Sequence, residues 1–238
     1  MNLSHVERYF SDFLSHMETP DNPFELDGYK NSDDEEEATG ILPYPDNLFV
    51  IGTVNIDETT YMFSPKVLDR ANVVEFKPDK DDVLNMFNAS GQQVKITPAK
   101  SGVAEAFLRL AKEIRSGESG LNDGQMAEVK EVFTSIYEIA EKNGYEFAYR
   151  TVREIRQYLS AAFRLSGHWT DQEMYCAIDE QLLQKVLPKI HGNRKEIGNM
   201  LEELEKVCGQ DGKELKLSAK KIEQMKGKLA AVQYASFI

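Results

Sequence analysis

A short run of polar residues follows an apolar segment in the first third of the chain. Residues 48–54 are apolar apart from Gly52 and Thr53, and Asn55, Asp57 and Glu58 come directly after them. Further along the chain, Arg70 precedes a second, shorter apolar stretch at residues 73–76. An asparagine amide donates and accepts hydrogen bonds at once, and an arginine guanidinium is a permanent planar cation. These residue types suit the positioning of a water molecule and the stabilisation of a phosphoryl-transfer transition state.

The apolar run 48–54 is predicted to be a strand buried on both faces, because its length and β-branched content are typical of a parallel sheet covered by helices. Residues 73–76 indicate a second short strand, and Ser64-Pro65 predicts a short helix between the two. Ligands bind at the carboxyl ends of strands in open α/β sheets, which is where Asn55 is expected. Two strands cannot form a stable sheet with both faces covered. The pattern therefore predicts that sheet neighbours lie outside this sequence.

The remaining pattern is helical. Apolar residues recur at three- and four-residue intervals in the first 18 residues, which predicts an amphipathic helix. An acidic loop is expected at about 20–46, followed by the strands, and the boundary between two domains is placed after residue 78. The expected fold is α/β over residues 1–78 and all-α over 79–238, so that the chain is mainly helical overall. Helices are predicted near residues 80–89, 100–116, 123–143, 149–165, 171–187, 194–208 and 214–229.

The net charge of −12 is concentrated at the N-terminus. Residues 1–47 contain 12 acidic and 2 basic residues and so carry −10 of the total. The cluster Asp33 to Glu37 is interpreted as part of a solvated loop, so the acidity says little about partners. No run of about 18 apolar residues and no signal-peptide pattern is present, which predicts a cytoplasmic protein without a membrane contact. The histidines and the two cysteines show no metal-ligand spacing, and no metal site is predicted.

Two motifs in the region 52–70 resemble the AAA+ superfamily, specifically the clade of the McrB-type motor subunit of 5-methylcytosine-specific restriction systems. Gly52-Thr53-Val54-Asn55 matches the GT-x-N motif of that clade, and Leu68-Asp69-Arg70 matches its L-x-R motif. The resemblance implies that Asn55 is the sensor 1 residue. It also implies that Arg70 is an arginine finger acting in trans, in the catalytic site of a neighbouring subunit.

The resemblance extends, more weakly, to both ends of the chain. Met1-Asn2-Leu3 is similar to the D-E-[IM]-N continuation of the Walker B strand, so Asn2 is the residue that follows Walker B. The segment 147–153 resembles the start of a lid helix that carries a sensor 2 arginine, with Arg150 as the candidate and Arg153 as the alternative. Residues 187–192 resemble a later lid segment.

The implied parent protein is a ring-forming, hexameric ATPase or GTPase that uses Mg²⁺ and drives a nuclease subunit, with DNA as an indirect partner, in a restriction-type defence system. No GxxxxGK[ST] loop and no Walker B strand occurs in the sequence. The chain is therefore expected to be the C-terminal part of such a motor, beginning just after Walker B, and to be inactive alone, with no cofactor of its own.

Simpler interpretations remain for each residue. Asn55 suits a turn or a helix cap, Arg70 suits a surface ion pair with Asp69, and Arg150 suits a solvated helix face. At the level of the chain, the alternative is a non-catalytic helical protein-interaction module with a vestigial nucleotide site. A third interpretation is a phosphate-binding basic helix near the C-terminus. Its lysines are Lys213, Lys216, Lys220, Lys221, Lys226 and Lys228.

Overall fold

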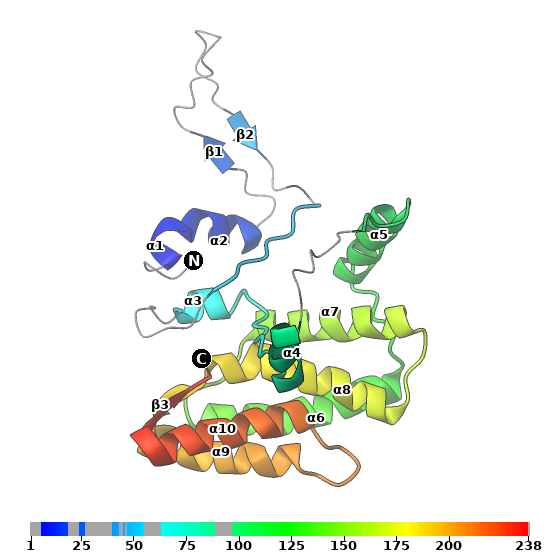
Figure 1. Ribbon diagram of the computed structural model, residues 1–238. Helices are drawn as coiled ribbons and strands as arrows, with labels where there is room; N and C mark the ends of the chain where they lie inside the picture. The colour runs from blue at the N-terminus through cyan, green and yellow to red at the C-terminus, as the bar shows by residue number, and fades with distance from the viewer. Residues whose placement is uncertain are drawn as a thin grey trace. The chain divides into compact units, whose positions relative to one another are not determined.

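The computed structural model describes residues 6–18, 24–26, 40–42, 45, 47–54, 63–88 and 97–237 (Figure 1). The chain divides into two compact units, one within residues 1–71 and the other formed by residues 72–237. Helices predominate among the described residues, which confirms the prediction of a mainly helical protein.

The first unit contains short elements. Helices α1 (Val6–Tyr9) and α2 (Ser11–Glu18) occupy the predicted amphipathic segment, and α3 (Pro65–Leu68) begins at the predicted proline. Val6, Leu14 and Leu68 are its buried apolar residues within the described part of the chain. Strands β1 (Phe24–Leu26) and β2 (Gly40–Leu42) pair antiparallel in the region that the sequence predicts to be a loop.

Residues 48–54 and 73–76, which the sequence predicts to be parallel strands, form no strand in the structure. Neither segment forms a ladder with any strand among the described residues, and Ile51 is 91% exposed and Phe76 92% exposed. A strand needs a neighbour to bond its N–H and C=O groups, and an apolar pattern alone does not supply one. The described residues therefore do not confirm the predicted partial AAA+ core.

The second unit is a helical bundle, and its helices follow the predicted segments. Each of the five long helices that form its centre buries at least one fully inaccessible apolar side chain in the core. One such residue from each helix, in chain order, is Ile136, Leu159, Ile178, Leu201 and Ile222. The helices are α4 (Lys80–Asn85), α5 (Val103–Arg115), α6 (Asp123–Lys142), α7 (Tyr149–Ser166), α8 (Asp171–Gln181), α9 (Arg194–Cys208) and α10 (Lys216–Val232).

Local signals in the sequence set the ends of these helices. Asn122, Thr170 and Asn193 each form a capping box with the residue three positions later, at the starts of α6, α8 and α9. Gly167 ends α7 in the left-handed conformation at φ 82°, which costs a glycine little.

The chain between α8 and α9 is irregular. A π-helical turn η2 (Leu182–Val186) and a 3₁₀ turn η3 (Leu187–Lys189) follow α8 directly. Strand β3 (His191–Asn193) then pairs antiparallel with β4 (Tyr234–Ser236), so the C-terminal segment closes against the start of α9. The sequence did not predict β3 and β4, because three-residue strands carry almost no periodicity.

A buried carboxylate in α8 holds the start of α10. Helix α10 has no capping side chain at its own N-cap, but Asp179 accepts hydrogen bonds from the N–H groups of Leu217 at 2.6 Å and Ser218 at 2.8 Å. Burial raises the pKa of the Asp179 carboxyl, and the hydrogen bonds from Ser218 and Leu217 oppose that rise. Asp179 therefore caps a helix that is distant in sequence.

Replacing Asp179 tests this cap. Asp179→Ala leaves two helix N–H groups without an acceptor and is expected to lower the free energy of unfolding by about 1–2 kcal/mol. Asp179→Asn keeps one acceptor oxygen and removes the buried charge, so its loss is smaller. Urea denaturation followed by far-UV circular dichroism measures both, and an equal loss for the two variants would contradict the cap.

Candidate functional site

The candidate site lies where the first turns of α7 face η2 and η3. Ala148, the N-cap of α7, provides no side-chain acceptor, so the positive end of the helix is not capped by a side chain. The predicted sensor 2 residue Arg150 is half-buried in the first turn, and the alternative, Arg153, is exposed. Tyr149 is 95% exposed beside them.

Two lysines reach α7 from the facing segment. The side chain of Lys185 is fully buried and forms an ion pair with Glu154. The Lys189 ammonium donates a hydrogen bond to Thr151 Oγ1 at 3.1 Å. Thr151 and Glu154 of α7 contact Lys189 and Lys185 in that order, so α7 runs antiparallel to the segment formed by η2 and η3.

The same contact continues toward the C-terminal half of α7. Tyr158 donates a hydrogen bond to the Glu180 carboxylate, and burial, together with that carboxylate, raises the pKa of Tyr158. Polar contacts with α7 therefore continue from Lys185 in η2 to Glu180 in α8.

Gln181 adds a polar side chain without partners. It is fully buried, and neither its amide nitrogen nor its amide oxygen makes a hydrogen bond to the described protein. An unsatisfied buried amide costs about 1–3 kcal/mol. Natural proteins keep few such groups, and they often mark functional positions. The neighbouring π-helical turn is a second feature that is frequent at functional sites.

The charge of this contact favours an anion. Within residues 149–155 of α7 and 185–189 opposite them, the charges of Lys185 and Glu154 cancel in their ion pair, and the other charged residues are Arg150, Arg153 and Lys189. The positive end of α7 adds to the same sign. Arginine, lysine and helix N-termini are the groups with which proteins bind phosphates.

Arg70 has a different environment in the first unit. It lies in the turn after α3, where its Nε donates to the carbonyl oxygen of Leu14 at 3.2 Å and its Nη1 donates to that of Lys66 at 2.5 Å. The guanidinium thus ties α3 to α2. The other predicted site residues, Asn55 and Asn2, lie outside the described residues.

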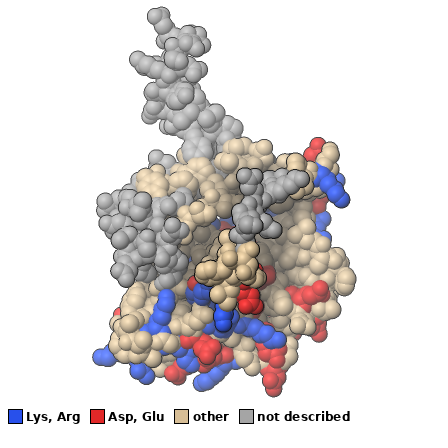
Figure 2. All heavy atoms as spheres, viewed as in Figure 1, with Lys and Arg blue, Asp and Glu red and all other residues tan. Residues whose placement is uncertain are grey.

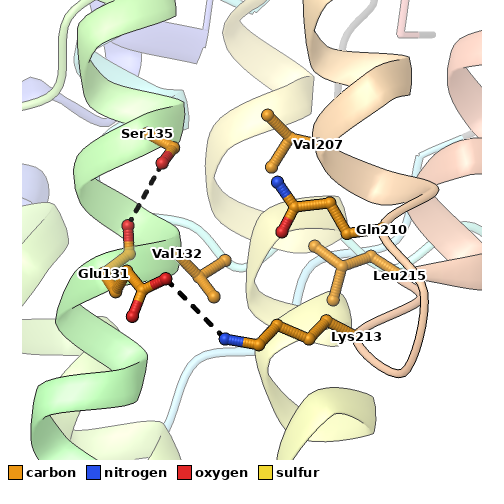
Figure 3. Close-up of a pocket in the computed structure, with 7 residues that line it drawn as sticks. All are labelled: Glu131, Val132, Ser135, Val207, Gln210, Lys213 and Leu215. Atoms are coloured by element: carbon orange, nitrogen blue, oxygen red, sulfur yellow. Dashed lines mark hydrogen bonds and ion pairs between the residues drawn. The ribbon is translucent and has the colours of Figure 1, made fainter.

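A small pocket occurs elsewhere in the helical unit, between α6 and the connection from α9 to α10 (Figure 3). Lys213 reaches into it toward Glu131, with 3.7 Å between ammonium and carboxylate. Its volume of about 40 Å³ has room for a few water molecules, which is too small for a nucleotide. The pocket is therefore not a nucleotide site.

Ion pairs involve three of the six lysines of the predicted basic segment. Lys221 pairs with Glu75, Lys226 with Glu205, and Lys213 with Glu128 at 3.4 Å. On the face shown in Figure 2, basic and acidic side chains alternate over the lower part of the molecule. This arrangement weakens the interpretation of a phosphate-binding basic helix, because the field of each paired lysine is largely cancelled.

The described residues contain neither a metal-binding cluster nor a membrane-spanning helix. No set of three or more histidine, cysteine, aspartate or glutamate side chains is arranged to hold a metal ion. None of the helices in the same part of the chain has the length and apolar content needed to cross a membrane.

Comparison with known proteins assigns the helical unit to a family. The model of the family described as "Domain of unknown function (DUF8727)" matches residues 95–234, more than half of the chain, and the protein belongs to this family. The matched region runs from just before α5 to the start of β4 and so contains the contact of α7 with η2 and η3. No curated protein and no solved structure matches the chain.

Sequence reasoning missed the buried Gln181 and Lys185 and the half-buried Lys189. These three polar residues recur every four positions through a segment that is otherwise rich in leucine and valine. A polar stripe at helical spacing within an apolar helix indicates one buried polar face, and this signal would have identified them.

Two substitutions test the buried ion pair. Glu154→Gln leaves the inaccessible Lys185 ammonium without its carboxylate and is expected to lower the free energy of unfolding by about 2–4 kcal/mol. Lys185→Met removes the buried charge, keeps most of the volume and is expected to change it by less than about 1 kcal/mol. Guanidinium denaturation compares the two variants. A larger loss for Lys185→Met than for Glu154→Gln would contradict the pairing.

Gln181→Met tests the unsatisfied amide. The methionine has a similar shape and removes two polar atoms that have no protein partner, so an increase in unfolding free energy of about 1–2 kcal/mol is expected. Thermal and urea unfolding measure the change. Destabilisation would mean that the amide is satisfied in solution.

Proposed function

We propose that the chain is the C-terminal part of an AAA+ nucleotide-hydrolysing motor subunit of a restriction-type DNA defence system, and that the helical unit is its lid. In this proposal the P-loop and the Walker B acids belong to sequence N-terminal to residue 1. The observation that carries the proposal is the start of α7, where Arg150 lies in the first turn of a helix without a side-chain cap and the adjacent Thr151 accepts a hydrogen bond from Lys189.

The roles of the residues follow from their chemistry. Bound ATP or GTP with Mg²⁺ supplies the γ-phosphoryl group and the metal charge. Arg150, with Arg153 as the alternative, binds phosphate oxygens from the lid side, and the positive end of α7 supports that contact. Asn55 orients the attacking water, because its amide both donates and accepts. The residues present therefore fit an anionic ligand.

Arg70 acts in the site of a neighbouring subunit in this proposal. Its side chain must first release the carbonyl oxygens of Leu14 and Lys66. Each of these hydrogen bonds is worth about 0.5–3 kcal/mol, so a transition-state phosphate competes well for the guanidinium. A hexameric ring and a nuclease partner belong to the same proposal.

The exposed apolar residues support a missing neighbour. Leu48, Phe49 and Val50 are 37–45% exposed in the first unit, and Ile51 is almost fully exposed. Contiguous exposed apolar side chains mark a surface that another element covers. In the proposed motor, that element is the remainder of the central sheet.

The first test is to read the coding DNA upstream of the Met1 codon in all three frames. The proposal expects a GxxxxGK[ST] loop followed by an apolar strand that ends in Asp-Glu. An upstream region that encodes neither would exclude a severed motor.

The second test is the hydrolysis rate of the longer product. Arg70→Ala is expected to lower kcat by about 10³-fold or more, as for other arginine fingers, without loss of nucleotide binding. Arg150→Ala is expected both to lower kcat and to raise KM for the nucleotide. Arg109→Ala, an exposed arginine on α5, serves as the matched control and should have wild-type kinetics. Wild-type rates for Arg70→Ala would refute the finger role.

A second candidate function is a non-catalytic interaction module, and one observation favours it. Helix α4 and the following 3₁₀ turn η1 (Met86–Asn88) bury none of their residues, and Phe87 is 87% exposed while Met86 is 71% exposed. In this case the protein binds a partner through α4 and η1, and Arg70→Ala has no effect on that binding.

A further inference from the structure

Residues 73–77 begin the helical unit and lie extended along it. The N–H of Val73 donates a hydrogen bond to the carbonyl oxygen of Gln184 in η2 at 3.0 Å. Four residues after Gln184 stands Pro188, which has no N–H to complete a helical hydrogen bond with that carbonyl. The proline thus leaves an acceptor that the linking segment uses.

An ion pair with a buried lysine holds the same segment two residues later. The Glu75 carboxylate accepts a hydrogen bond from the Lys221 ammonium at 2.7 Å, and the Lys221 side chain is only 7% exposed. The ammonium also lies 4.1 Å from the ring centroid of the buried Phe237. Lys221 therefore joins the linking segment, α10 and the C-terminal segment.

The third contact lies another two residues along. Lys77 donates a hydrogen bond to Gln224 Oε1 at 2.7 Å and lies 3.3 Å from the Glu75 carboxylate. Between the contacts, Val74 is 57% exposed and Phe76 is 92% exposed. Alternate residues of an extended chain point to opposite sides, so residues 73, 75 and 77 hold the helical unit while residues 74 and 76 face away.

We propose that residues 73–77 are a rigid tether, positioned by Lys221, which confines hinge motion between the two units to Ala71 and Asn72. The division between the units falls between these two residues, directly after Arg70. Movement of the helical unit is then transmitted to the backbone next to Arg70. This transmission to a catalytic group rests on the proposed function, whereas the tether itself does not.

Three interactions hold the segment. The hydrogen bond to Gln184 fixes the backbone, the Glu75–Lys221 pair fixes one side chain, and the Lys77–Gln224 hydrogen bond fixes another. Because the Lys221 ammonium is shielded from solvent, its pair with Glu75 is stronger than a fully exposed contact. Lys77 and Lys228 lie close enough to Lys221 to interact with it electrostatically, so Glu75 is the carboxylate that balances a basic cluster. Loss of Glu75 or Lys221 therefore releases the segment.

Amide hydrogen exchange tests the tether locally. In the wild-type chain the Val73 amide is expected to exchange at least about tenfold more slowly than an unstructured amide, and Lys221→Met and Glu75→Gln should each remove most of that protection. Lys226→Met is the matched control, because it breaks the 2.5 Å ion pair of α10 with Glu205 and does not touch the linking segment. An unprotected Val73 amide in the wild type overturns the proposal.

The width of the distance distribution between two spin labels, one on each unit, tests whether the tether limits motion between the units. The exposed Cys176 on α8 is a natural labelling site, and Lys66→Cys adds one on α3. Cys208 is buried, and burial raises the pKa of its thiol to about 12, so it is not labelled. Lys221→Met and Glu75→Gln are expected to broaden the distance distribution about twofold, and Lys226→Met is expected to leave it unchanged.

The outcomes separate the tether from the motor. Equal widths in wild type, Lys221→Met and Glu75→Gln overturn the tether, whatever the hydrolysis assays show. Broadening in both variants, with an unchanged control, supports it even if Arg70→Ala has no effect on hydrolysis. The helical circular dichroism of each variant must match that of Lys226→Met, so that unfolding of the bundle does not imitate release of the tether.

Discussion

The missing N–H of Pro188 is the constraint on which the arrangement of the helical unit depends. A helix that continued from α8 would carry residues 182–193 along one axis, whereas the proline ends it through a π-helical and a 3₁₀ turn. The chain is then free to form β3, which pairs with the C-terminal β4. The same constraint leaves the carbonyl of Gln184 to Val73. One residue thus connects the end of α8, the closure of the C-terminus and the attachment of the linking segment.

Charge and polarity are buried where these features meet. Lys185 is inaccessible against α7, Lys221 is nearly so against Glu75, and Gln181 is fully enclosed. Apolar side chains of similar volume would stabilise a bundle at least as well, so stability alone does not account for them. Polar contacts of fixed geometry do select one register between α7 and the end of α8. This register also brings Lys189 to the start of α7, where Arg150 and Arg153 lie.

The helices were predictable because each carries its information locally. Capping residues such as Asn122 and Thr170, together with apolar residues at helical spacing, marked the segments that α6 and α8 occupy. The segment 48–54 was not predictable in the same way, because a strand exists only through its neighbours. Of the candidate site, Arg150 was predicted from its motif, and it lies in the first turn of α7. Lys185 and Gln181 were not, since burial of a polar side chain is decided by the helix packed against it. Nothing local to Val73 or Glu75 indicated partners more than 100 residues away, at Gln184 and Lys221.

The π-helical turn has a consequence for how the family tolerates changes in length. A π turn holds one more residue than the α-helical turn it replaces, so residues 182–186 store a single-residue insertion. Deleting one residue there would convert the turn to α-helical spacing and keep the residues that follow on nearly their present faces, so that Lys189 could still reach Thr151 and β3 its partner β4. Inserting a further residue has no such outlet and would rotate everything downstream by about 100° around the helix axis. The turn therefore tolerates the loss of one residue better than the gain of one.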